Sequence, residues 1–195
     1  MRSTKLILGS LFLTAICAFG FRHNSEPKST MTIDKVSLHL SANRGLFTFE
    51  NAPFSGIAIQ YGQDSSVVES ASFKDGKRDG ILTKWFPNGV KSYEANYDSG
   101  KINGKSYSWW SNGKLRSEAT FENGVLSGVQ KKWYQSGIRF KETHLENGKE
   151  VGLQRAWREN GKLYVNYEAK NGRAFGLQRA NLCYQLDNET VTYED

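Results

Sequence analysis

Three glutamates recur at a constant spacing and are the first candidates for chemistry in this chain. Glu94, Glu118 and Glu142 lie 24 residues apart, and rows of carboxylates can act as acid and base groups or as cation ligands. Equivalent strands two spacings apart in a sheet would hold these carboxylates about 10 Å from one another. That separation is too large for a catalytic pair, so we expect the row to meet basic side chains on intervening strands. The nearby bases are Lys84, Arg116 and Lys132.

The histidines and cysteines do not form a metal-binding or nucleophilic set. None of the histidines has a partner at a metal-ligand spacing, and Glu142 with His144 would be two solvent-facing residues of one strand. Cys183 has no evident histidine partner, and its apolar neighbourhood favours a small buried side chain. The sequence contains no phosphate-binding loop and no nucleophile elbow. We therefore predict a protein that is not an enzyme and that has no catalytic residue, metal site or cofactor. The three histidines are His23, His39 and His144.

Aromatic residues also recur every 24 residues, in two adjacent series. We expect the first series to form a ladder that is buried on one face of a sheet. The second series would emerge from the opposite, polar face beside turns, where exposed rings suit stacking on sugars or on a partner's surface. The second series is therefore the predicted binding set. The first series is Trp85, Trp109, Trp133 and Trp157, and the second is Phe86, Trp110 and Tyr134.

The elements that must position these residues are marked by glycines in phase with them. Fifteen of the 19 glycines follow the same 24-residue step, without insertion or deletion, which is typical of a repeat protein. They form three series: Gly56, Gly80, Gly104, Gly128, Gly152 and Gly176; Gly76, Gly100, Gly124, Gly148 and Gly172; and Gly89, Gly113, Gly137 and Gly161. We interpret all of them as structural, with positive φ angles in the tight turns that end at Gly89 and its equivalents.

Each unit reads as strand, tight turn, strand and longer turn. The runs 81–86 and 90–97 alternate as half-buried strands do, and we expect Ile81, Thr83 and Trp85 to share a face with Tyr93, Ala95 and Tyr97. Glycines every few residues argue against helices, because each costs about 1 kcal/mol inside one. The predicted fold is all-β: an elongated single-layer antiparallel sheet of repeated β-hairpins with a 24-residue period.

The repeated motif resembles a known family. The pattern G-x-x-x-G-x-x-x-x-W-[FWYR]-x-[NS]-G, followed by a strand that contains glutamate, is similar to the MORN-repeat variant found in proteins named YwqK-family antitoxins. The resemblance covers about residues 54 to 178. It implies an elongated array of β-hairpins, and the family name suggests an inhibitor of a co-encoded protein.

The two ends of the chain differ from the repeats. Residues 1–20 have basic residues before an apolar run and small residues at its end, which predicts a secretory signal peptide; a retained membrane anchor and a lipidated Cys17 are the alternatives. We expect residues 21–45 to be a short flexible leader, in which residues 36–40 alternate as one extra strand would. Residues 46–180 would form the array, with a degenerate first unit from Leu46, and residues 181–195 a cap and tail.

These features favour a binding protein over other classes. The chain has 26 Lys and Arg against 20 Asp and Glu, but they form no dense basic run, so nucleic acid is not an expected partner. We predict an exported, periplasmic, cell-envelope or secreted module that binds a protein or a cell-envelope polymer through repeated weak contacts. The alternatives are a structural protein that pairs as a homodimer through its apolar face or sheet edges, and an antitoxin-like inhibitor.

Overall fold

The computed structural model describes residues 30–177. The predicted signal peptide, Cys17, His23, Cys183 and the predicted cap at 181–195 lie outside the described residues. The described chain is built almost entirely of β-strands, with a single 3-10 turn, η1, at Lys35–Ser37. The strands are β1 Thr32–Asp34, β2 His39–Ser41, β3 Leu46–Phe49, β4 Ala52–Pro53, β5 Gly56–Tyr61, β6 Val67–Lys74, β7 Lys77–Trp85, β8 Lys91–Asp98, β9 Lys101–Trp109, β10 Leu115–Glu122, β11 Val125–Leu126, β12 Gly128–Trp133, β13 Arg139–Glu146, β14 Lys149–Glu150, β15 Gly152–Trp157, β16 Leu163–Lys170 and β17 Arg173–Leu177.

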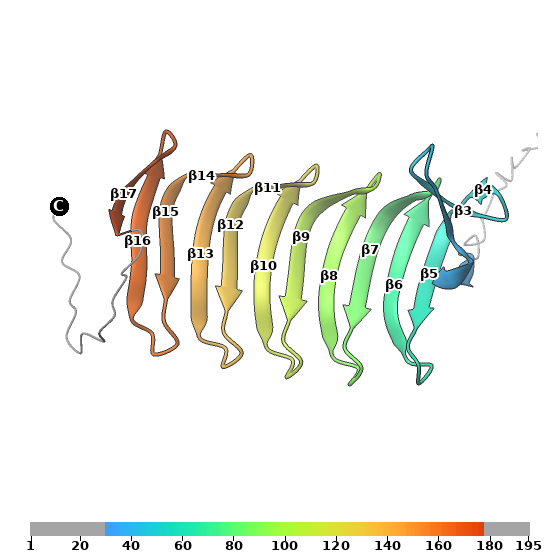
Figure 1. The fold of residues 1–195 in the computed structure, drawn as a ribbon, viewed down its shortest axis with the longest axis horizontal. Helices are drawn as coiled ribbons and strands as arrows, with labels where there is room; N and C mark the ends of the chain where they lie inside the picture. Colours follow the sequence, from blue (N-terminus) through green and yellow to red (C-terminus); the bar gives the residue numbers. More distant parts are fainter. Residues whose placement is uncertain (1–29, 178–195) are drawn as a thin grey trace, which may run out of the picture.

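Consecutive hairpins lie side by side in one long open sheet (Figure 1). The strand order is β1-β5-β6-β7-β8-β9-β10-β12-β13-β15-β16-β17, and the short strands β11 and β14 pair with β10 and β13. Every neighbouring pair along the array is antiparallel, except that β1 pairs with β5 in parallel. The predicted elongated all-β array of hairpins is thereby confirmed.

The alternation of side chains between the two faces differs from the prediction by one residue. Leu82 lies directly opposite Ala95, and Ile81 lies opposite Asn96, so the expected grouping of Ile81 with Ala95 is wrong. The cause is a bulge beside the turn: Trp85 pairs with Lys91, but Lys84 pairs with Tyr93. One extra residue on β8 shifts the register, and a one-residue shift exchanges the faces of a strand.

The sheet consequently has two distinct faces, to which we give names. The tryptophan face carries Trp85, Trp109, Trp133 and Trp157, all half-buried. The alanine face carries Ala58, Ala71, Ala95 and Ala156, which are 2% exposed or less. The most deeply buried row of the sheet therefore consists of small side chains on the face opposite the indoles, and the expected burial of the tryptophan ladder as the core is wrong.

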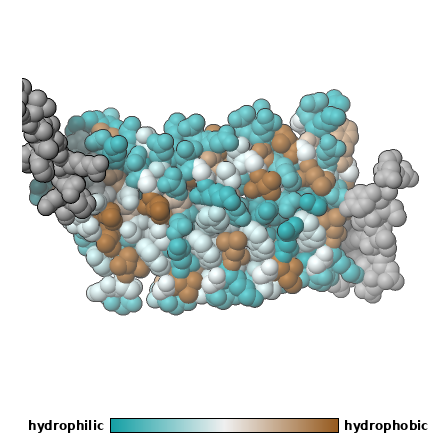
Figure 2. Space-filling view, turned by 180° about the vertical axis from the view of Figure 1, so that it is seen from behind, coloured by the Kyte–Doolittle hydropathy of each residue, from teal (hydrophilic) through white to brown (hydrophobic). Residues whose placement is uncertain are grey.

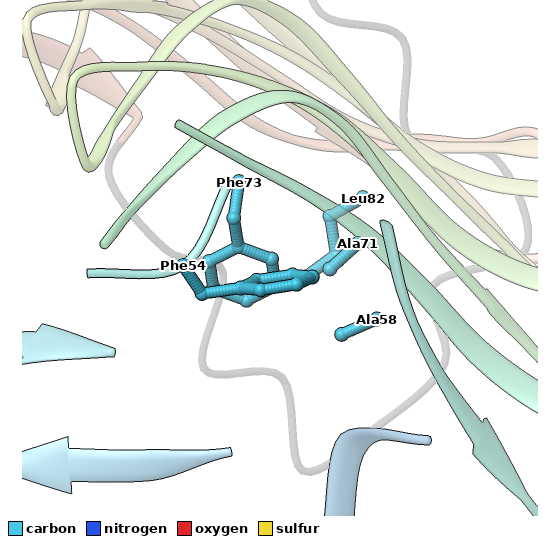
Figure 3. Close-up of a cluster of buried hydrophobic side chains, with 5 residues drawn as sticks. All are labelled: Phe54, Ala58, Ala71, Phe73 and Leu82. Carbon is cyan, nitrogen blue, oxygen red and sulfur yellow. The ribbon is translucent and has the colours of Figure 1, made fainter. Parts of the chain in front are cut away.

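A compact hydrophobic core exists at the N-terminal end of the alanine face. Phe54, Ala58, Ala71, Phe73 and Leu82 form it (Figure 3). The ring of Phe73 meets those of Phe47 and Phe54 at centroid distances of 5.1 and 5.8 Å, in edge or tilted geometries that aromatic pairs favour.

Strands β2, β3 and β4 form a separate three-stranded sheet beside the first hairpins. Leu46–Phe49, interpreted above as the start of a degenerate first unit, belongs to this small sheet and not to the array. Two main-chain hydrogen bonds attach it, from Phe47 N to Gly76 O and from Gly76 N to Phe54 O, both 2.8 Å. The segment before the repeats therefore packs onto the alanine face and covers the first hairpins there.

Candidate binding surface

The turns that end in Gly89, Gly113, Gly137 and Gly161 have a common geometry. In the first of them, Phe86 O accepts a hydrogen bond from Gly89 N at 2.9 Å, and Phe86 N donates to Val90 O at 2.8 Å. The same two bonds close the turns at Trp110, Tyr134 and Arg158. The four glycines have φ between 77° and 92°, which confirms the prediction of positive φ at these positions.

The opposite connections are tighter than expected. They were predicted as the longer turns, but Lys74 pairs directly with Lys77, and Asp98 with Lys101. Both central residues have positive φ, as in Asp75 at 49° and Gly76 at 77°, which is the type I′ geometry that matches the twist of paired strands. The equivalent pairs are Ser99-Gly100, Asn123-Gly124, Asn147-Gly148 and Asn171-Gly172.

The glycines at 80, 104, 128, 152 and 176 lie close to the type I′ turns and have φ between 63° and 113°. At the first of them, Ala71 pairs with Leu82 but Phe73 pairs with Arg78, so β7 holds two extra residues around Gly80. Such bulges bend a strand. Gly100 N then donates to Arg78 O of the preceding unit at 2.8 Å, and Gly124 N to Ile102 O. The bent tips therefore connect one hairpin to the next.

The three predicted binding residues lie beside the other turns, on the alanine face. Phe86, Trp110 and Tyr134 are half-buried rather than exposed. Trp110 Nε1 donates to Trp133 O at 3.2 Å, and Tyr134 Oη donates to Trp157 O at 2.9 Å. Each of these two rings thus reaches across to the following hairpin, which explains why it is less exposed than the sequence indicated. A role of the three rings in binding stays a prediction.

A groove of about 380 Å³ opens beside Trp110. The Trp110 ring forms one wall, and the Arg116 guanidinium lies 4.7 Å from its centroid, a cation–π distance. Ser108 and Ser117 share a hydrogen bond of 2.6 Å between their hydroxyl oxygens. The remaining lining residues are Tyr93, Lys132, Trp133 and Phe140. The groove therefore combines flat rings, hydroxyl groups and two cations.

A model of one repeat family matches the chain at two units. Residues 78–99 and 102–123 each match the MORN repeat variant. Two of its units are MORN repeats. No curated protein matches the chain, and its relation to YwqK-family antitoxins stays a prediction.

The two matched MORN repeats provide most of the hairpins β7–β8 and β9–β10, and so they contribute Trp110, Arg116 and both serines of the groove. Asn88 and Asn112 join the turns of successive units: Asn88 Nδ2 donates to Ser111 O at 2.9 Å, and Asn112 Nδ2 donates to Gln135 O at 3.0 Å. The MORN repeats therefore form a continuous framework rather than independent hairpins.

The glutamate row lies on the tryptophan face and is fully engaged in ion pairs. Glu94 meets Lys91 at 2.7 Å, Glu118 meets Lys105 at 2.8 Å, and Glu142 meets Arg155 at 2.7 Å and Arg139 at 3.4 Å. Burial alone would raise the pKa of Glu142, but the hydrogen bond and charge of Arg155, with Arg139, hold it below its usual value. The carboxylates do meet bases, yet not the expected ones.

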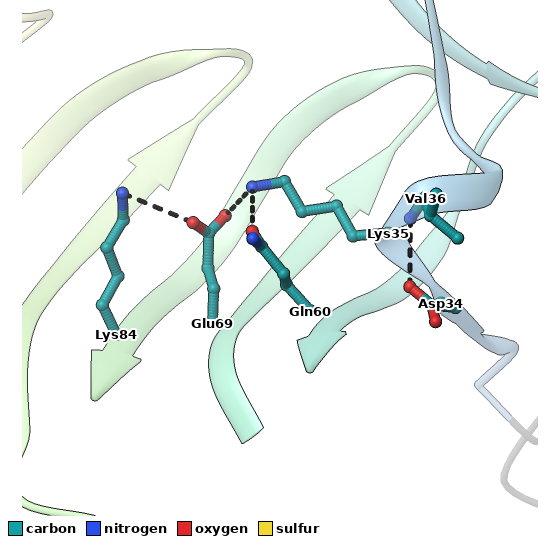
Figure 4. A network of polar contacts seen from close by, with 6 residues as sticks. All are labelled: Asp34, Lys35, Val36, Gln60, Glu69 and Lys84. Carbon is teal, nitrogen blue, oxygen red and sulfur yellow. Dashed lines mark hydrogen bonds and ion pairs between the residues drawn. The ribbon is translucent and has the colours of Figure 1, made fainter. Parts of the chain in front are cut away.

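The bases expected to meet this row lie on the other face. Lys84 binds Glu69 at 3.3 Å, and Lys35 binds the same carboxylate at 2.8 Å while also donating to Gln60 Oε1 (Figure 4). Burial raises the pKa of Glu69, but the two lysines outweigh that effect and hold it below the usual value. Glu69 is 6% exposed, so this cluster is a buried ionic clasp between η1 and the first hairpins.

Directly opposed residues continue from this clasp across the alanine face in one row. Successive strands contribute Gln60, Glu69, Lys84, Tyr93, Ser108, Ser117, Lys132 and Lys141. We call this the transverse row. Its one carboxylate, Glu69, lies at the N-terminal end. Lys132 was considered only as a base for the glutamate row, and Lys141 was missed because the predicted alternation placed it on the tryptophan face; the only sequence sign was the Lys131-Lys132 pair.

The remaining surface is mixed. One broad side of the array shows separate apolar patches among polar residues (Figure 2). Among residues 30–177, no three His, Cys, Asp or Glu side chains are grouped as metal ligands would be, and His144 Nδ1 instead lies 2.6 Å from Leu153 O. Within the same range, no helix has the length and apolar character required to cross a bilayer.

Proposed function

We propose that this protein is an exported, non-catalytic binding module that holds a protein or a cell-envelope polymer along the alanine face of its hairpin array. The observation that carries the proposal is the groove beside Trp110, where aromatic rings, cations and hydroxyl groups of three successive hairpins line one hollow. Equivalent rings at Phe86 and Tyr134 extend this surface to both sides. Repetition lets weak contacts add along one ligand.

The test is affinity capture from an envelope extract with the mature protein and with a variant in which Phe86, Trp110 and Tyr134 are alanine. We expect the variant to lose the captured partner. Its control has Ile81, Val129 and Leu153 changed to alanine; these side chains are exposed on the tryptophan face. Retention of every partner by the first variant, with its melting temperature unchanged, would refute the proposal.

A structural role is the second candidate, favoured by the sheet ends. Strand β17 pairs only with β16 among the described residues, and an edge of this kind is a template for pairing with another chain. Sedimentation of the mature protein distinguishes a homodimer from a monomer. An antitoxin-like role would require an exported target, and a neighbouring gene for a secreted toxin would support it.

A further inference from the structure

The alanine face holds a set of cations that no carboxylate neutralises. Arg116, Lys132 and Lys141 take part in none of the ion pairs found for Glu69, Glu94, Glu118 and Glu142 in the described part of the chain. Lys132 and Lys141 are direct cross-strand partners, and like charges in that position repel each other. Arg116 and Lys132 line the groove beside Trp110, and Lys141 lies directly across from Lys132; we call these four residues the cationic groove.

On the tryptophan face, by comparison, several cations are paired with glutamates. Lys91, Lys105, Arg139 and Arg155 each have a glutamate partner there. In the cationic groove, by contrast, Lys132 is flanked across the strands by Ser117 and Lys141. An anionic ligand would remove this repulsion and supply the missing charge partner.

The groups beside these cations suit a sugar polymer. The Trp110 ring is held by its bond to Trp133 O and lines the groove with the Arg116 guanidinium over it, so a sugar ring would meet the indole beside Arg116, while the Ser108 and Ser117 hydroxyls both donate and accept hydrogen bonds. Equivalent strands lie about 10 Å apart, close to the length of two linked sugar rings. A linear polysaccharide can therefore present a similar group to each successive hairpin.

An acidic peptide fits this position less well. Extended peptides bind sheets mainly through main-chain hydrogen bonds at an exposed edge. The cationic groove lies on β9, β10, β12 and β13, whose main-chain groups already pair on both sides in the interior of the sheet. A peptide there would keep its charges but lose its main-chain contacts.

We propose that the cationic groove binds a carboxylated polysaccharide, with Lys132, Lys141 and Arg116 at its carboxylates and Trp110 against a sugar ring. This inference rests on the proposed binding function and names its ligand class.

The experiment is calorimetric titration of the mature protein with oligogalacturonate. Two comparison ligands separate charge from sugar: the methyl-esterified oligosaccharide, which has the same rings without charge, and polyglutamate, which has the charge without rings. We expect binding to oligogalacturonate that weakens with salt, and at least about tenfold weaker binding to both comparison ligands.

The lysine variants have a matched control on the same strand, β12. Lys132→Gln with Lys141→Gln is expected to weaken oligogalacturonate binding at least about tenfold, whereas Lys131→Gln is expected to leave it unchanged. Lys131 precedes Lys132 on β12 but belongs to the tryptophan face, opposite Glu118 and Glu142. Trp110→Phe is used in place of Trp110→Ala. It removes the Nε1 donor but keeps an aromatic ring, so that a loss of binding is not caused by unfolding of the protein.

Three results would overturn the inference: no binding of oligogalacturonate, equal binding of polyglutamate, or equal loss in Lys131→Gln. The proposed function has a separate outcome. If oligogalacturonate fails to bind but the envelope capture still retains a partner that is lost with Phe86, Trp110 and Tyr134, the binding function stands and the carboxylated polysaccharide is excluded.

Discussion

At the scale of single residues, the charged side chains divide the molecule into different regions. On the tryptophan face, the half-exposed Glu94 and Glu118 meet nearby lysines, and pairs of this kind contribute little to stability. Two carboxylates are buried instead: Glu142 beside two arginines, and Glu69 beside two lysines on the other face. Tyr167 is half-buried, and its partial burial and its hydrogen bond to Glu150 raise its pKa to about 12.

The buried clasp predicts a specific pH dependence. The folded pKa of Glu69 lies below its ordinary value of 4.5, so its stabilisation is full above the unfolded pKa and is lost as the pH falls through the folded value. We expect Glu69→Gln to lower the free energy of unfolding by about 1–3 kcal/mol at neutral pH. Urea unfolding from about pH 7 to pH 3 should show the difference from wild type shrinking below about pH 4.5.

The control for this prediction is Glu118→Gln. Its pair with Lys105 is exposed, so we expect a change below about 1 kcal/mol at any pH. A constant difference between Glu69→Gln and wild type across the whole pH range would show that the charge of Glu69 does not contribute.

At the scale of elements, two kinds of turn give each hairpin its shape. The type I′ turns set the pairing at one end, and the glycine-ended turns with their neighbouring bulge shift the register at the other. The bulge decides which side chains share a face. A glycine pattern alone therefore identifies the hairpins without identifying their faces.

The glycine-ended turns predict a loss of stability that comes from the backbone alone. Gly113 has φ of 82°, and a Cβ added there would meet nothing within 4 Å. We expect Gly113→Val to lower the free energy of unfolding by about 1–3 kcal/mol, because β-branched residues resist positive φ. Gly113→Asn is the control and should cost clearly less, since asparagine tolerates this region. Equal losses in denaturant unfolding would point to a cause other than backbone strain.

At the scale of the whole molecule, the array is unequal along its length. Its buried phenylalanines lie at the N-terminal end, under the small sheet of β2, β3 and β4. The later hairpins contain a buried row of small and polar side chains, such as Gln154, which is fully buried and donates to His144 O and Val151 O. Repeats that contact mainly their neighbours can open locally.

This asymmetry predicts a local response to mutation. We expect Phe73→Ala to cost about 3–5 kcal/mol and to reduce amide protection mainly in β5–β7 while β12–β16 stay protected. Phe121→Ala is the matched control: it is the same change 48 residues along the repeat, at a half-buried ring, and should cost less. Hydrogen exchange measures both variants. Equal loss of protection along the whole array would indicate one cooperative unit.

The sequence by itself determined the architecture of this protein, because its glycines and aromatic residues recur every 24 residues and local turn chemistry dictates hairpins. It also placed positive φ correctly at Gly89, Gly113, Gly137 and Gly161. Only the tertiary structure decided the faces, because one bulge residue per hairpin reverses the alternation and leaves no clear mark in composition. That reversal placed Leu82 beside Ala95 in the buried row and left Trp85 half-buried on the other face. It also paired Lys141 with Lys132, which lines the groove beside Trp110, because cross-strand neighbours depend on register, which no single strand encodes.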